Sequence, residues 1–169
     1  MNPFAFTSQR VGIFIDTQNI YHSAKNFYGK NVDFGKLVEI LNQGRNLIRT
    51  IAYVIKSDLT PKEIAFFESL ILRGIELRIK DIIYLPSGEK KADWDVGIAV
   101  DTIKLSKFLD VIILVSGDGD FTHLVEYLKT KGNIVEIAGF GRNTSVKLRE
   151  LADFFYDLDE LKDHILIKK

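Results

Sequence analysis

The chain has 169 residues, 46% of them hydrophobic and 27% charged, a balance typical of one folded domain and unlike that of a disordered or fibrous protein. Lysine plus arginine and aspartate plus glutamate number 23 each, so no global basic field attracts nucleic acid, and a nucleic-acid partner would have to be held by a local patch. The absence of cysteine excludes disulfides, thiolate metal sites and cysteine nucleophiles.

The apolar segments are too short to cross a membrane. None approaches the roughly 18 residues that a membrane span needs. The first ten residues, MNPFAFTSQR, also lack the basic and apolar regions of a secretory signal. The sequence therefore predicts a cytoplasmic protein with no membrane partner.

Strand-like and helix-like segments alternate along the chain, with no linker or repeat between them. The strand candidates are rich in β-branched and aromatic residues, and they span 10–16, 47–56, 75–85, 110–115 and 133–140. Capping residues and terminal glycines indicate a helix that begins at Thr17 and further helices at 33–44, 60–74, 93–107, 120–131 and 143–153.

This alternation predicts right-handed βαβ units and a three-layer α/β/α sandwich with a central, mostly parallel sheet. One domain is expected at 10–160, between an N-terminal extension at 1–9 and a C-terminal tail at 161–169. In such a sheet the functional crevice lies at the carboxyl ends of the strands.

Three separate segments carry polar residues that this edge of the sheet would gather. They follow the first strand, open the helix predicted at 93–107, or follow the strand at 110–115. The set comprises Asp16, Asn19, Asp93, Asp95, Asp101, Asp118 and Asp120.

Each aspartate taken alone has a structural explanation. Asp16 could cap the helix that begins at Thr17, and Asp95 could lie in a first helical turn, where negative charge is favoured by roughly 0.3–1 kcal/mol. In SGDGDF (116–121), one aspartate can cap the next helix, but the second carboxylate then has no structural task and repels the first. This excess of charge, together with the other two segments, favours an acidic metal site.

Oxygen ligands without thiols favour a hard cation, Mg²⁺ or Mn²⁺, over zinc. Such a cation can bind phosphate oxygens, activate water and stabilise the leaving oxygen during phosphodiester hydrolysis. Repulsion among the carboxylates should raise one of their pKa values until metal binds. Asn19 and Ser116 could orient water or phosphate without adding charge, and no side chain is an obvious general base.

Other site templates fail on specific positions. The chain contains no P-loop motif and no nucleophile elbow. GFGRN (139–143) lacks the third glycine of a dinucleotide fingerprint, and DGDFTH (118–123) has His123 where a calcium loop needs glycine. The three histidines have no metal-ligand spacing.

The same segments resemble a known family. FIDTQNIY, DWDVGIAVDTIKL, SGDGDFTHLVEYLKTKG and VEIAGFGRNTSVKLRELADFFYDL are similar, in order, to the four signature blocks of NYN-domain proteins of the LabA-like group, within the PIN-like nuclease superfamily. The resemblance covers about residues 11–158 and implies a PIN-like fold, a Mg²⁺ or Mn²⁺ site and ribonuclease activity. The matching site residues are Asp16, Asn19, Asp95, Asp118 and Asp120, with Asp101 also matching.

One block departs from the family pattern. The segment KKADWDV displaces Lys91 by one residue and adds Asp93 and Trp94. The departure puts a role for Lys91 in doubt and makes Asp93 a candidate additional metal ligand.

Two local patches are candidates for contact with RNA. Lys91 and its neighbour Lys90 could hold phosphates, and Trp94 could stack on a base of single-stranded RNA, although lysines at a turn often serve solubility and Trp94 could pack in the core. A second turn, which follows a strand and opens a helix, offers Arg142, Asn143 and Ser145.

The sequence as a whole predicts a ribonuclease that hydrolyses phosphodiester bonds with a divalent metal. Asp16, Asp95, Asp118 and Asp120 are its expected metal ligands. The alternative is a non-catalytic regulator that uses the same fold to bind RNA or protein. A phosphatase with Asp16 as nucleophile ranks last, because Gln18 stands where a second carboxylate is needed. The apolar start NPFAF and the aromatic FFYDLDEL could form a homodimer contact, although ordinary packing explains them as well.

Overall fold

The central sheet has six strands, all parallel. The computed structural model describes residues 1–56, 60–84 and 90–167. The strands lie in the order β3-β2-β1-β6-β7-β8. They are β1 (Arg10–Asp16), β2 (Asn46–Lys56), β3 (Glu76–Asp81), β6 (Val111–Val115), β7 (Ile134–Gly139) and β8 (Phe154–Asp157).

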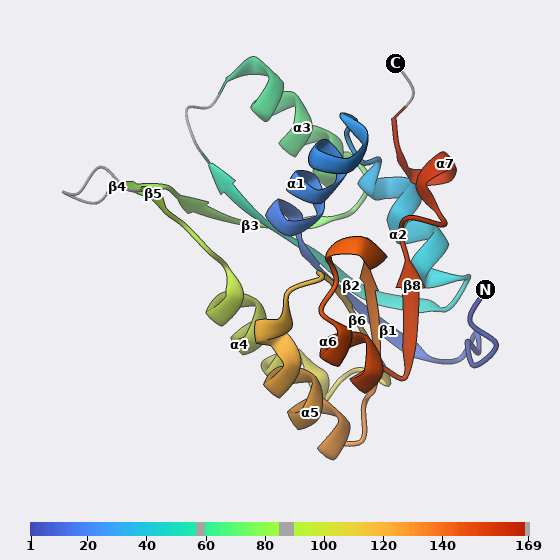
Figure 1. The fold of residues 1–169 in the computed structure, drawn as a ribbon. Coiled ribbons are helices and arrows are strands. Elements are labelled where there is room, and N and C mark those ends of the chain that lie inside the picture. Colours follow the sequence, from blue (N-terminus) through green and yellow to red (C-terminus); the bar gives the residue numbers. More distant parts are fainter. Residues whose placement is uncertain (57–59, 85–89, 168–169) are drawn as a thin grey trace.

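Helices cover both faces of this sheet (Figure 1). One face packs against α1 (Thr17–Tyr28), α2 (Phe34–Asn42), α3 (Pro61–Leu72) and α7 (Lys162–Ile165). The other face packs against α4 (Asp95–Ser106), α5 (Thr122–Thr130) and α6 (Val146–Leu151). Two short 3₁₀ helices, η1 (Gly119–Phe121) and η2 (Gly141–Asn143), precede α5 and α6. The predicted three-layer α/β/α sandwich is confirmed.

The strand sequences explain the two cores. Along β1, Val11, Ile13 and Ile15 pack into the core with α1, whereas Phe14 packs into the core with α4. Successive side chains of a strand point to opposite faces, so a strand that is covered on both faces is apolar at every position. The uninterrupted run VIILV of β6 is buried throughout for the same reason.

Two parts of the sheet differ from the prediction. The single strand predicted at 75–85 divides into β3 and a short strand β4 (Ile83–Tyr84), which pairs antiparallel with β5 (Lys90–Lys91) outside the central sheet. The second difference is β8, which the sequence did not predict. Its aromatic residues pair with β7 inside the chain, so packing accounts for FFYD, while Phe4 and Phe6 at the N-terminal end are exposed.

A buried ion pair lies inside the fold, between the turn that joins α2 to β2 and strand β7. The Arg45 guanidinium donates to both carboxylate oxygens of Glu136, at 2.7 and 2.9 Å, and both side chains are almost fully buried. The hydroxyl of Tyr156 and the side-chain amide of Asn2 also donate to Glu136. The first residues of the chain are thereby hydrogen-bonded to the central sheet.

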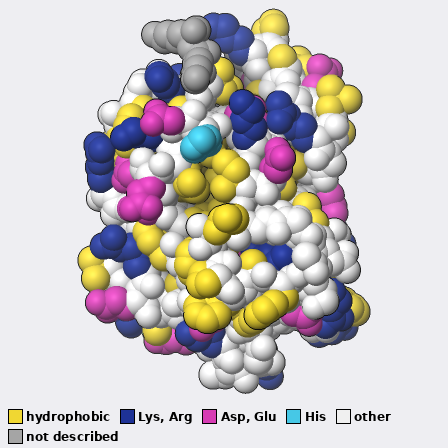
Figure 2. Space-filling model, turned by 90° about the vertical axis from the view of Figure 1, so that its right-hand side faces the viewer, with side chains coloured by type: hydrophobic (Ala, Val, Ile, Leu, Met, Phe, Trp, Pro, Cys, Tyr) yellow, Lys and Arg dark blue, Asp and Glu magenta, His cyan; other side chains and the backbone are white. Residues whose placement is uncertain are grey.

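None of the helices in the described ranges is long and apolar enough to span a membrane. Figure 2 looks at the side of the molecule that carries α2 and α7, and shows basic and acidic side chains mixed over it. This mixture matches the zero net charge of the chain, and it gives that side no broad basic surface for nucleic acid.

Candidate metal centre

The predicted acidic residues meet where the chain connections of the sheet diverge. From β1 the connections run towards β2 and β3, and from β6 they run the other way, towards β7 and β8. This point between β1 and β6 is a topological switch point, and the crevice at the carboxyl ends of the two strands is the usual ligand site in such sheets. Because Ile15 pairs with Val115, the next residues, Asp16 and Ser116, lie next to each other at that edge.

Asp16 has two separate contacts. One carboxylate oxygen accepts the backbone N–H of Asn19, so Asp16 caps α1 as the sequence indicated. The other oxygen accepts the hydroxyl of Ser116 at 3.0 Å. Capping therefore accounts for only one of the two carboxylate oxygens. Burial raises its pKa, although the two hydrogen bonds oppose that effect.

Asn19 connects α1 to the loop after β6. Its side-chain oxygen accepts the backbone N–H of Gly117 at 3.0 Å. On the other side of the loop, the Gly117 carbonyl accepts the backbone N–H of Ser145. A Cβ at Gly117 would lie 3.0 Å from the carbonyl oxygen of Asn143, so only glycine fits between the two neighbouring segments. The loop SGDGDF is thus held in place from both sides.

Within this loop the two aspartates have different tasks. Asp118 caps η1, because its carboxylate accepts the backbone N–H of Asp120 at 2.9 Å, and its own N–H donates to the Ser116 hydroxyl oxygen. The carboxylate of Asp120 has no hydrogen-bond donor among the described residues. The structure therefore agrees with the expectation that one carboxylate of the pair lacks a structural task.

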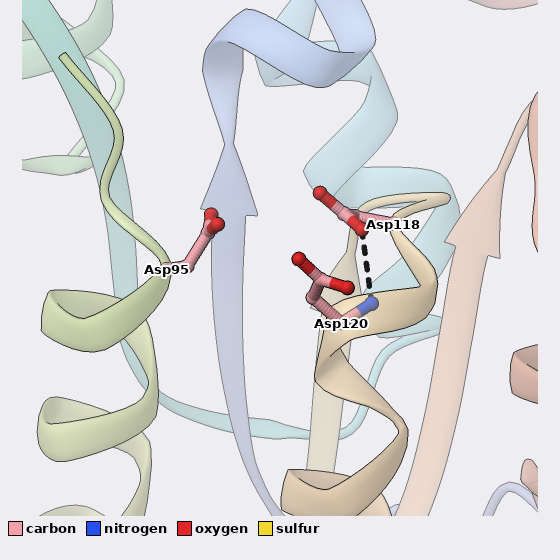
Figure 3. A group of neighbouring side chains, drawn as sticks. All are labelled: Asp95, Asp118 and Asp120. Atoms are coloured by element: carbon pink, nitrogen blue, oxygen red, sulfur yellow. Dashed lines mark hydrogen bonds between the residues drawn. The ribbon is translucent and has the colours of Figure 1, made fainter. Parts of the chain in front are cut away.

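Asp95, at the first position of α4, completes a cluster with these two residues (Figure 3). One carboxylate oxygen from each of Asp95, Asp118 and Asp120 lies within 4.8 Å of the others. The end of β1, which carries Asp16, lies between Asp95 and Asp118 in this view. Three separate segments of the chain thus bring carboxylates to one place.

The pKa of Asp95 reflects the closeness of these carboxylates. Burial and the charges of Asp118, Asp16, Asp93 and Asp120 raise the pKa of Asp95 to about 6. Like charges held this close disfavour ionisation, and a bound divalent cation would remove the repulsion. The exposed Asp93 belongs to the same electrostatic environment.

Asp101 has other partners. Its carboxylate accepts the Tyr53 hydroxyl and the Arg78 guanidinium, both at 3.2 Å. It is not one of the three carboxylates grouped above. The ion pair with Arg78 gives Asp101 a structural task six residues further along α4 than Asp95.

Trp94 is packed against the fold. Its indole N–H donates to the Val54 carbonyl, its ring meets the Tyr53 ring edge to face at 5.4 Å, and the Lys80 ammonium lies 4.6 Å from the ring centre. Of the two roles that the sequence allowed for Trp94, packing within the fold and stacking on an RNA base, these contacts agree with packing. The backbone of Lys91 lies in β5, and its side chain is outside the described residues.

The second predicted patch lies against the SGDGDF loop. Ser145 caps α6, and the Asn143 side-chain amide donates to the Ser23 hydroxyl at 3.0 Å. The Arg142 guanidinium is exposed, forms an ion pair with Asp159 at 3.6 Å and lies over the Tyr28 ring. All three side chains thus have partners within the chain, and Ser145 also holds the loop through its backbone N–H, which donates to the Gly117 carbonyl.

Sequence reasoning did not single out Thr17 or His22. The charge of His22 lowers the pKa of Asp16, so this side chain belongs to the surroundings of the centre. Thr17 is 6% exposed, and its hydroxyl has no hydrogen-bond partner among the described residues. Nothing in the sequence marked these positions, because a threonine and a histidine in the first two turns of a helix are ordinary.

The donor set fits a hard divalent cation. All three grouped side chains offer carboxylate oxygens, the ligands that Mg²⁺ and Mn²⁺ prefer, and their mutual repulsion is relieved when a cation binds. Asp16 is not one of these three carboxylates, and its contacts with Ser116 and with the backbone of Asn19 fix its position. Such partners orient ligands in metal sites and tune their basicity.

Comparison with known proteins supports a single relationship over nearly the whole chain. The family model of the NYN domain matches residues 10–159. The low amplitude and bright protein LabA of Synechococcus elongatus is 26% identical over 172 residues, covering 95% of this chain and 90% of that protein. The crystal structure of a protein of unknown function from Vibrio parahaemolyticus, 34% identical, matches with a TM-score of 0.87 and covers 95% of this chain and 98% of that one.

Proposed function

Since the chain belongs to the NYN domain family, whose members are generally nucleases, we propose that it is a ribonuclease that hydrolyses RNA phosphodiester bonds with Mg²⁺ or Mn²⁺. The family membership and the PIN-like α/β fold predicted from the sequence are confirmed. The observation that carries the proposal is the convergence of Asp95, Asp118 and Asp120, backed by Asp16, at the switch point of the sheet.

The acidic side chains have two different roles in this proposal. Asp95, Asp118 and Asp120 would hold the cation. Asp16 would support them through its own charge and through the hydroxyl of Ser116, to which the N–H of Asp118 also donates. When bound, such a cation supplies Lewis-acid stabilisation of phosphate oxygens and lowers the pKa of water.

The acidic residues also bear on substrate binding. Four carboxylates without a cation repel a phosphate, so we expect RNA to bind at this edge of the sheet only when the repulsion is neutralised. Asn19 holds the loop with its carbonyl oxygen, which leaves its amide N–H groups as neutral donors for a phosphate oxygen. The proposed substrate is single-stranded RNA, whose backbone can follow a narrow edge, and the proposed location is the cytoplasm.

The test is cleavage of labelled single-stranded RNA by the pure protein with Mn²⁺ or Mg²⁺, with chelator, and with Asp118→Asn. Asparagine is also a good N-cap, so this substitution removes the charge and is expected to leave η1 formed. Asp163→Asn, an exposed aspartate in the first turn of α7, is the matched control. We expect cleavage that requires both the metal and Asp118.

Two results would contradict the proposal. Cleavage that persists in chelator, or in Asp118→Asn, would come from another protein in the preparation or from another site. Binding of RNA without turnover, over varied substrates and both metals, would favour the non-catalytic regulator predicted as the alternative.

A further inference from the structure

Helix α4 exposes apolar side chains on the surface that points away from the sheet. Val96, Val100 and Ile103 are 74%, 41% and 40% exposed, whereas Ile98, on the opposite side of the helix, is fully buried. Residues three and four apart are neighbours on a helix, so the three exposed side chains form one continuous α4 stripe. Phe108, in the turn after the helix, adds a fourth exposed apolar side chain. Single exposed apolar residues are ordinary, but a contiguous group of them marks a contact surface.

The polar residues in the middle of α4 have their partners inside the fold. The Asp101 carboxylate accepts the Tyr53 hydroxyl and the Arg78 guanidinium, and the buried Thr102 hydroxyl donates to the Ile98 carbonyl at 2.6 Å. A surface helix normally turns its polar residues towards water, and a helix that is apolar on both sides is normally covered on both. Because α4 lies at one end of the row that it forms with α5 and α6, its outer surface is accessible to another molecule (Figure 1).

The two ends of α4 carry opposite charges. Asp93 and Asp95 lie at its N-terminal end, and the exposed Lys104 and Lys107 lie at its C-terminal end. Asp93 and the two lysines form no ion pair with any residue that the structure describes. Asp93 and Lys107 are the seventh residues before and after Val100, so each lies about 10 Å from it along the helix.

This arrangement of charges fits a second copy of the same helix. In an antiparallel pair of α4 helices centred on Val100, the acidic end of each copy lies beside the lysines of the other, and the two stripes pack together. A two-fold interface uses the same patch on both copies, so each complementary contact occurs twice. RNA would need a surface of one basic sign, whereas this surface is apolar in the middle and carries both signs.

We propose that the chain forms a two-fold symmetric dimer in which the α4 stripes of two copies pack antiparallel. The contact is one helix long, about 18 Å, so the total buried area is at most about 1,200 Å², and the Kd for dimerisation is expected in the micromolar range. Each acidic centre gains the lysines of the partner copy as neighbours. The inference does not depend on the ribonuclease proposal, because it is drawn from the outer surface of α4 alone.

The first test is sedimentation of the full chain at concentrations from about 1 µM to about 300 µM, over which monomers should become dimers. Val100→Glu places two like charges at the two-fold contact, and this variant should stay monomeric throughout. Val146→Glu is the matched control, since Val146 is also an exposed valine on a helix, at the start of α6, and its variant should dimerise like the unmodified chain. Equal Tm values of Val100→Glu and the unmodified chain at about 1 µM would show that the fold is retained.

A charge reversal tests the complementary ends. Lys107 and Lys131 each follow directly on a helix, and each ammonium lies over an aromatic ring, at 4.8 and 5.3 Å from its centre. Local effects on the two helices are therefore similar in Lys107→Glu and Lys131→Glu. We expect Lys107→Glu to weaken dimerisation at least about tenfold and Lys131→Glu to leave it unchanged.

Disulfide crosslinking tests the register. The chain contains no cysteine, so Val100→Cys introduces a single thiol. At the two-fold contact this thiol meets its own copy, and oxidation with diamide should give a covalent dimer, because a disulfide needs Cα atoms about 4.4–6.8 Å apart. Val146→Cys should remain monomeric under the same conditions.

Two results would overturn the inference. One is a monomer at every concentration, without a crosslink in Val100→Cys. The other is a dimer that persists in both Val100→Glu and Lys107→Glu, because its contact would then lie elsewhere, for example at the exposed Phe4 and Phe6.

Discussion

Asp95→Asn should make the metal-free protein more stable at neutral pH. In the folded chain the Asp95 carboxylate has a pKa of about 6 in place of the ordinary 3.8, because it is partly buried among other carboxylates. Full shielding from water would make this difference worth about 3 kcal/mol, since each pKa unit corresponds to about 1.4 kcal/mol. Asp95 is only partly buried, so screening by water reduces the gain to about 1 kcal/mol.

The sign of the effect fixes its pH window. An acid whose pKa is raised by folding binds its proton more tightly in the folded state, so ionisation of Asp95 lowers the free energy of unfolding as pH rises from about 4 to about 6. Above about pH 6 the penalty is complete, and asparagine removes it. Towards pH 4 both states carry a protonated carboxyl, and the advantage of the variant should vanish.

Thermal unfolding in chelator, followed by circular dichroism, measures this gain. For a chain of this size about 1 kcal/mol corresponds to a rise in Tm of about 2–4 °C. Asp163→Asn removes the same charge outside the acidic group and should give no such rise. Added Mn²⁺ should then reverse the order, because bound metal at a hundred times its Kd stabilises a folded chain by about 2.7 kcal/mol and Asp95→Asn lacks a ligand.

An unchanged or lower Tm of Asp95→Asn in chelator would refute the claim that repulsion destabilises this group. An equal Mn²⁺-induced rise in Tm for Asp95→Asn and for the unmodified chain would refute Asp95 as a ligand.

Three further substitutions test the surroundings of the centre and the core. Ser116→Ala removes the hydroxyl that donates to Asp16, and we expect metal affinity, measured by titration calorimetry, to fall about 10–100-fold with the fold retained. Gly117→Ala would place a methyl group 3.0 Å from a backbone oxygen, so urea unfolding should show a loss of about 1–3 kcal/mol; an unchanged midpoint would mean that the loop has room. Glu136→Gln leaves the buried charge of Arg45 without its counter-ion and should cost about 3–5 kcal/mol in the same assay, whereas a loss below about 1 kcal/mol would contradict the burial of the pair.

Local sequence signals predicted much of the fold because they act over a few residues. Thr60 and Pro61 mark the start of α3, and the Thr60 hydroxyl accepts the backbone N–H of Glu63 as expected. The uninterrupted apolar runs of β1 and β6 predicted strands that are covered on both faces. The short strand β8 was not predicted, because the four residues FFYD show no alternation of apolar and polar side chains that would distinguish a strand from a loop.

In the candidate site, too, local sequence signals predicted some features and missed others. The spacing of Asp118 and Asp120 in a glycine-rich turn pointed to a crowded loop, and capping does account for only one of the two carboxylates. Asp95 and Asp101 could not be told apart from spacing alone. Six residues of helix turn the chain by about 600° and advance it by about 9 Å, so the two side chains point in different directions, and only packing decided which one faces the loop.

By itself, the sequence determined the parallel α/β architecture, the family and the acidic segments that carry the chemistry, because these properties follow from periodicity, caps and short motifs. Tertiary structure alone decided that β1 and β6 are neighbours, although Asp16 and Ser116 stand 100 residues apart in the chain. Strand order depends on which apolar faces pack together over the whole sheet, and no local signal encodes it. The same packing turned Asp101 towards Arg78 and placed the Trp94 indole against the Val54 carbonyl.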